Sequence, residues 1–91
     1  MTAQQAGPLQ VDPLLIGTLE LTGSRVPCVN LGHEPFAHTQ LRVGETEYTF
    51  DRSYPITGHS AVMPGAIADL QAQGRKVLVA ERNERYCVYL A

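Results

Sequence analysis

The sequence predicts a small α+β domain, mostly of antiparallel strands, with one short helix near residues 64–73. Three observations lead to this class. The chain ends in two apolar segments separated by a polar pair, which is typical of a β-hairpin. A helical repeat of apolar residues lies just before that hairpin. The earlier part consists of short apolar runs broken by turn residues, which is typical of strands.

The first twelve residues are mostly polar or small and contain Gly7 and Pro8. This composition predicts a flexible N-terminal arm over residues 1–12, followed by a single β-rich domain over residues 13–91.

Four strands are expected before the helix, at residues 14–21, 25–31, 36–43 and 46–50. Pro27 cannot donate to a ladder and therefore predicts an edge or a bulge in the second strand. Gly44 and Glu45 form the turn of the hairpin that joins the third and fourth strands. Residues 51–63 are expected to be irregular. The element order is then β-β-β-β-α-β-β.

The helix is expected to start at Pro64, whose missing N–H costs nothing in a first turn, and to end before Gly74. Its apolar residues recur at helical spacing and should face the core: Met63, Ile67 and Leu70.

The C-terminal hairpin, with its turn at Asn83 and Glu84, is apolar on both faces. One face carries Val77, Val79, Val88 and Leu90, and we assign the helix to cover it. The other face carries Leu78, Ala80, Cys87 and Tyr89. Because side chains alternate along strands, this second face needs its own cover. Either the first four strands curl over it, as a partly open barrel or sandwich, or a second subunit covers it.

The composition favours a globular protein, with 44% hydrophobic residues and a formal net charge of −2. This charge provides no long-range attraction to nucleic acid or to anionic membranes. The first residues lack the features of a signal peptide and no run is apolar enough to span a membrane, so a cytoplasmic location is expected. Cys28 and Cys87 are then expected to be thiols rather than a disulfide.

The doubly apolar hairpin favours a non-enzymatic binding or assembly module that acts through protein–protein contacts, as a subunit, an inhibitor or an adaptor. The partner is then another protein or a second copy of the chain, and no cofactor is expected. The candidate interface combines the second hairpin face with the arm: Leu78, Cys87, Tyr89, Leu9 and Val11.

A histidine-based metal site is one alternative, since imidazole is a common metal ligand. Its candidate ligands are His33, His38 and His59. Their spacing matches no standard ligand pattern.

A thiol hydrolase is a second alternative. The segment from His38 to Phe50 resembles the histidine-bearing strand pair of circularly permuted papain-like thiol hydrolases, in which a histidine begins a strand and an aromatic-rich strand returns. The resemblance covers thirteen residues. It implies that His38 is the general base and that Cys87 is the nucleophile. In that family the cysteine opens a helix, whereas Cys87 lies within a strand here.

Nucleic-acid binding is a third alternative, although neither nucleic acid nor a membrane is an expected partner. Four cations lie close together in the sequence, and Tyr54 or Tyr86 offers a stacking surface. The cations are Arg75, Lys76, Arg82 and Arg85, with Glu81 and Glu84 interleaved among them.

Overall fold

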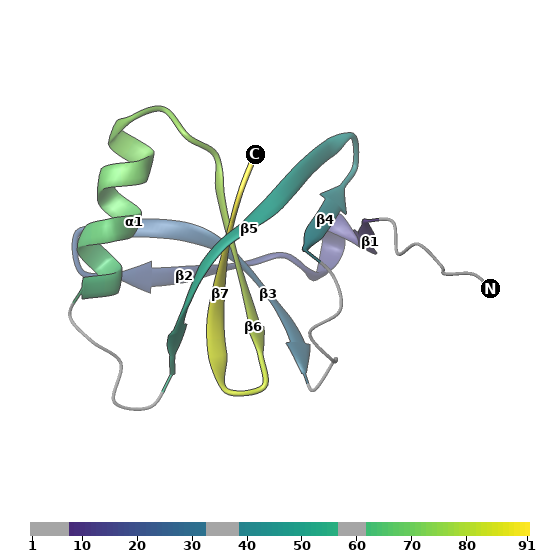
Figure 1. Ribbon diagram of the computed structural model, residues 1–91, viewed down its shortest axis with the longest axis horizontal. Helices are drawn as coiled ribbons and strands as arrows, with labels where there is room; N and C mark the ends of the chain where they lie inside the picture. Colours follow the sequence, from purple (N-terminus) through teal and green to yellow (C-terminus); the bar gives the residue numbers. More distant parts are fainter. Residues whose placement is uncertain (1–7, 33–38, 57–61) are drawn as a thin grey trace.

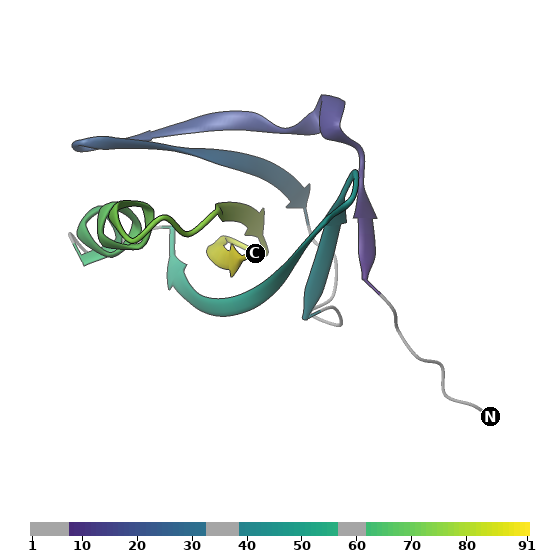
Figure 2. The same ribbon diagram turned by 90° about the horizontal axis from the view of Figure 1, so that it is seen from above.

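The computed structural model describes residues 8–32, 39–56 and 62–91. Within this part of the chain, seven strands form one curled, mixed sheet in the order β1-β4-β5-β7-β6-β3-β2. The sheet curls into a half-barrel with the helix α1 on one side, and Figure 2 shows the final hairpin enclosed between β3 and β5. The small β-rich α+β domain with one helix is therefore confirmed.

The final hairpin consists of β6 (Val77–Arg82) and β7 (Arg85–Leu90) and lies near the middle of the sheet (Figure 1). Its register agrees with the prediction, from Val77 opposite Leu90 to Ala80 opposite Cys87. Asn83 and Glu84 have φ of 52° and 63°, as a type I′ turn requires. This turn matches the right-handed twist of the two strands.

The helix α1 (Val62–Ala72) covers the hairpin face to which it was assigned. The predicted apolar stripe is buried, and Gly74 follows the helix with φ of 81°. The helix begins two residues before Pro64, so the predicted start was slightly late. One core cluster unites the helix, β3 and this face of the hairpin: Val26, Met63, Ile67, Leu70, Val77, Val79, Val88 and Leu90.

The opposite face of the hairpin is covered by the chain's own strands. Val11, Val29 and Leu41 pack in one buried cluster with this face. The ring of Phe50 meets that of Tyr89 edge-on, with ring centroids 5.7 Å apart. Of the two covers considered from the sequence, the structure shows the curled sheet, because this cluster is already closed within one chain.

The N-terminal segment differs from the prediction. β1 (Leu9–Val11) pairs in parallel with β4 (Gln40–Val43), so these residues belong to the sheet and not to a flexible arm. Burial of Val11 in the curled sheet accounts for this pairing. Residues 1–7 lie outside the described part of the chain.

The expected first strand is also shorter than predicted. A 3₁₀ turn, η1 (Pro13–Leu15), replaces its start, and the strand β2 (Gly17–Leu21) follows. The side chain of Asp12 caps η1 by accepting a hydrogen bond from the Leu14 amide at 3.0 Å. The Asp12 cap and Pro13 together favour the 3₁₀ turn over an extended conformation at the start of the predicted strand.

Two further strands differ from the prediction, β3 in its direction and β5 in its length. β3 (Ser24–Gly32) lies between β2 and β6, and it runs parallel to β6, so Pro27 is not in an edge strand. The β3–β6 ladder begins at Cys28, one residue after that proline. β5 (Thr46–Pro55) extends through residues predicted to be irregular, because it pairs with β7 beyond an irregularity between Phe50 and Arg52.

A helix that crosses a membrane is long and apolar. None of the helices in the described residues is long and apolar enough to cross a bilayer.

The closed second face makes Leu78 a test of the fold. Leu78 is 2% exposed, and shortening such a leucine to alanine costs roughly 2–5 kcal/mol. A buried carboxylate costs more, so we expect Leu78→Asp to unfold the protein. Leu14→Asp is the matched control, because Leu14 is 90% exposed and should change stability by only about 0.5 kcal/mol. Circular dichroism would show both outcomes. A folded Leu78→Asp protein would contradict the described packing.

The type I′ turn gives a second test. Glu84 holds a left-handed conformation that costs a non-glycine residue roughly 1 kcal/mol. We expect Glu84→Gly to raise the free energy of unfolding by about that amount, measured by urea denaturation. Glu45→Gly, in the two-residue turn between β4 and β5, is the control. Glu45 is not among the described residues with positive φ, so its replacement should not stabilise the protein. Equal effects of the two substitutions would refute the turn assignment.

Candidate functional site

The residues predicted to form an interface do not lie on the surface. Leu78, Cys87 and Tyr89 are at most 4% exposed, Val11 is 6% exposed, and Leu9 is half-buried against the same cluster. The structure does bring these five residues together, but as the core of the curled sheet. A partner could reach them only by opening that sheet, so this interface is corrected to a structural core.

The three histidines of the metal hypothesis, His33, His38 and His59, lie outside the described residues. Within residues 8–32, 39–56 and 62–91, no group of three or more His, Cys, Asp or Glu side chains is arranged to hold a metal ion.

The two cysteines are free thiols on opposite faces of the sheet. Cys28 packs against the helix-side cluster, whereas Cys87 belongs to the cluster inside the curl. Burial, with a smaller contribution from the nearby Glu81 carboxylate, raises the pKa of Cys28 to about 11. A raised pKa keeps the thiol protonated and therefore a poor nucleophile. The proposed base of the hydrolase hypothesis, His38, lies outside the described residues.

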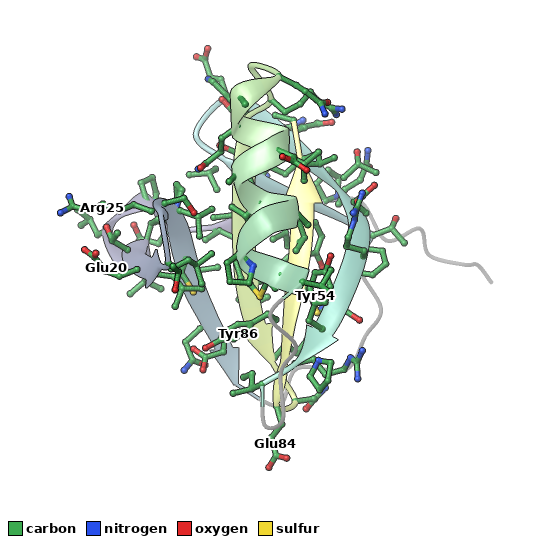
Figure 3. The ribbon with its side chains drawn as sticks, turned by 90° about the vertical axis from the view of Figure 1, so that its left-hand side faces the viewer. Glu20, Arg25, Tyr54, Glu84 and Tyr86 are labelled. Atoms are coloured by element: carbon green, nitrogen blue, oxygen red, sulfur yellow. The ribbon has the colours of Figure 1, made fainter. Side chains whose placement is uncertain are left out.

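The structure separates the cations of the nucleic-acid hypothesis. Arg75 and Lys76 precede the start of β6, while Arg82 and Arg85 flank the turn at its other end. Tyr54 and Tyr86 are cross-strand partners that pack beside the helix-side cluster (Figure 3). Six strand residues span about 20 Å, so the four cations do not form one patch.

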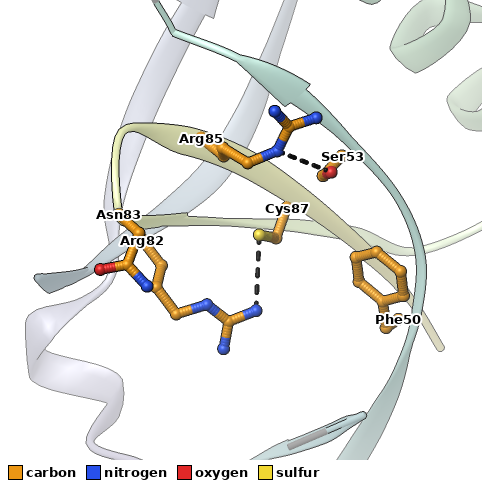
Figure 4. Close-up of a pocket in the computed structure, with 6 residues that line it drawn as sticks. All are labelled: Phe50, Ser53, Arg82, Asn83, Arg85 and Cys87. Carbon is orange, nitrogen blue, oxygen red and sulfur yellow. Dashed lines mark hydrogen bonds between the residues drawn. The ribbon is translucent and has the colours of Figure 1, made fainter. Parts of the chain in front are cut away.

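A pocket of about 210 Å³ lies inside the curl at the tip of the final hairpin. Figure 4 shows the side chains around it, with Arg82 on one side of Cys87 and Arg85 on the other. The pocket is lined by Phe50, Ser53, Arg82, Asn83, Arg85 and Cys87.

Arg82 is the one charged residue among the buried side chains of the described chain, at 2% exposure. Its Nη2 lies 3.2 Å from the Tyr89 hydroxyl and 3.4 Å from the Cys87 sulfur. Burial raises the pKa of Tyr89, and the neighbouring Arg82 opposes that rise. Arg85 is exposed, and its Nε donates to the Ser53 hydroxyl at 3.0 Å.

A second candidate site is the sheet edge formed by β2, at the opposite end of the strand order from β1. No other described strand pairs with its outer side. Leu14 and Leu15 directly precede this edge in η1 and are 90% and 67% exposed. Beside the edge runs a groove of about 270 Å³ between β2 and the start of α1. Its lining includes Leu19, Leu21, Met63, Pro64 and Tyr86.

Sequence reasoning missed both features, although it contained signals for each. The predicted hairpin register already places Arg82 and Arg85 opposite each other on the Leu78 face. The Asp12-Pro13 pair signals a capped turn that would remove Leu14 and Leu15 from a strand.

Comparison with known proteins gives no match: no family model, no curated protein and no solved structure matches the chain.

The placement of the thiols predicts their reactivity. Only a thiolate reacts quickly with iodoacetamide, so alkylation of Cys28 should increase as the pH rises towards about 11. Cys87 is 4% exposed and should react only after denaturation. Intact-mass time courses on the wild type, Cys28→Ala and Cys87→Ala would assign each site. Fast labelling of Cys87 near neutral pH, lost in His38→Ala, would contradict this account and support the hydrolase alternative.

Proposed function

We propose that this protein is a non-enzymatic assembly module that pairs with a second copy of itself through β2. The observation that carries the proposal is the open edge of the sheet beside two exposed leucines of η1. An edge strand presents unpaired N–H and C=O groups that can bind another strand. Exposed leucines next to such an edge add apolar area for a partner to bury.

The edge carries little protection against pairing. Natural proteins block edges with charges, prolines or bulges. β2 has no proline and only one charged residue, Glu20, which pairs with Arg25 at 3.2 Å (Figure 3). The edge is therefore available for an added strand.

The sequence of β2 is compatible with a two-fold antiparallel pairing. Centred on Leu19, this pairing places Thr18 opposite Glu20 of the second copy, so no like charges meet. Residues directly opposite share a face, so each copy adds its Leu19 beside the groove of the other. The η1 leucines of one copy then lie near the β2–β3 turn of the other.

Two charge variants of Thr18 test the pairing directly. Thr18 is exposed, so its replacement should leave the fold intact. Thr18→Glu places like charges opposite each other at two symmetric positions and should weaken the dimer several-fold. Thr18→Lys places opposite charges there and should strengthen it by a similar factor, with Thr18→Gln as the neutral control. Sedimentation equilibrium over a dilution series measures each dissociation constant.

The outcomes separate the proposal from its rivals. Opposite effects of Thr18→Glu and Thr18→Lys, with Leu14→Asp also weakening the dimer, support pairing through β2. A wild-type protein that remains a monomer at every concentration overturns the proposal. A dimer that responds equally to both charge variants overturns this interface.

A further inference from the structure

We propose that the groove between β2 and the start of α1 receives the leucines of η1 from the second copy. This inference rests on the proposed pairing through β2 and names the contact that lies beside the paired strands. Because such a pair is two-fold symmetric, the same contact forms twice, once at each end of the joined strands. Each copy then contributes both the leucines and the groove.

Strand pairing by itself covers too little surface to hold two copies together. β2 has five residues, whereas specific interfaces bury roughly 800 Å² on each partner. A pair of strands with no further packing is at best marginally stable in water. The dimer therefore needs apolar surface next to the paired strands.

Such surface lies at both ends of β2. Among the described residues, three large apolar side chains are well exposed: Leu14 at 90%, Leu15 at 67% and Val62 at 63%. The two leucines lie in η1, just before β2, and Val62 is the first residue of α1. The start of α1 lies beside the end of β2, across the groove (Figure 1). One contact between these two regions would cover all three side chains.

The register of the pairing brings the two regions together. In a two-fold pairing centred on Leu19, Ile16 of one copy lies opposite Thr22 of the other. Ile16 directly follows η1, and Thr22 lines the groove together with Pro64. The leucines of η1 therefore lie at the mouth of the groove, beside the start of α1.

Gly17 gives a second indication of a close neighbour. Its φ is not in the left-handed region, and a Cβ at this position would lie 3.8 Å from the Cys28 carbonyl oxygen, which is an ordinary contact. The single chain therefore does not require glycine here, although glycine weakens a strand. In the proposed pairing, Gly17 lies opposite Leu21 of the other copy, which lines the groove. The missing side chain leaves space at this point for a leucine of η1.

The lining of the groove suits leucine side chains. Most of its side chains are apolar: Leu19, Leu21, Ile56, Met63, Pro64 and Tyr86. Glu20 is the one charged residue of the lining. It alternates with Leu19 and Leu21, so its carboxylate lies on the other face of the sheet, where it pairs with Arg25. The leucines can therefore enter without burying an unpaired charge.

The direct test is a nuclear Overhauser experiment on mixed dimers of protein with ¹³C-labelled leucine methyl groups and unlabelled protein. We expect isotope-filtered contacts from the methyl groups of Leu14 or Leu15 to Pro64 of the other copy. Within one chain, Leu15 and the groove wall at Leu21 are separated by about 20 Å of strand, so these contacts cannot arise inside a single copy.

Charge variants at the start of α1 give a second measurement. Val62→Glu places a carboxylate where the leucines would be buried and should weaken the dimer roughly tenfold, measured by sedimentation equilibrium. Negative charge near a helix N-terminus is stabilising, so loss of the fold would not explain this result. Gly65→Glu is the matched control, because it adds the same charge to the first turn at an exposed residue outside the groove lining. It should leave the dissociation constant unchanged.

The outcomes distinguish this contact from the pairing itself. Contacts between the leucines and Pro64 of the other copy, with weakening by Val62→Glu and not by Gly65→Glu, support the inference. A dimer that responds oppositely to Thr18→Glu and Thr18→Lys, but lacks these contacts or is unaffected by Val62→Glu, overturns the groove contact and leaves the pairing through β2 in place. Equal weakening by Val62→Glu and Gly65→Glu also overturns the groove contact. A protein that stays monomeric at every concentration overturns both proposals.

Discussion

Burial of both faces of the β6–β7 hairpin is the constraint on which the rest of the structure depends. One face packs under α1, and the other packs against the curled N-terminal half of the sheet. A flat sheet would leave Leu78 and Tyr89 in water, so the strands must bend around them. The curl in turn brings β1 to β4 and encloses the pocket at the turn. The core and the pocket therefore both follow from the need to bury the two faces of this hairpin.

Local pattern was sufficient to predict the parts of the fold that are close in sequence. The hairpin register follows from the alternation of apolar residues around Asn83 and Glu84. The helix face follows from the spacing of Met63, Ile67 and Leu70. These elements depend on contacts between neighbouring turns or strands, for which propensity and periodicity are informative.

The remaining parts depend on long-range pairing. The parallel ladders β1–β4 and β3–β6 join segments separated by at least 30 residues. No turn motif or periodicity in the sequence predicts such pairings. β1 has only three residues, and the middle one, Gln10, is polar and exposed. Its sequence was therefore indistinguishable from that of a flexible arm. Asp51 to Pro55 look irregular alone and become a strand through β7. The interface prediction failed for the same reason, since a buried face and a binding face have the same sequence pattern. The predicted β6–β7 register already places Arg82 opposite Arg85, and both residues line the pocket at the hairpin tip.

The most direct test of the doubly covered hairpin is solvent paramagnetic relaxation of side-chain signals, measured with a soluble gadolinium chelate on dilute, monomeric protein. We expect Leu78, on one face, and Val88, on the other, both to be shielded, while Leu14 and Leu15 relax strongly. Strong relaxation of Leu78 at a concentration where the chain is monomeric would contradict the account, because the chain would then fail to cover its own hairpin.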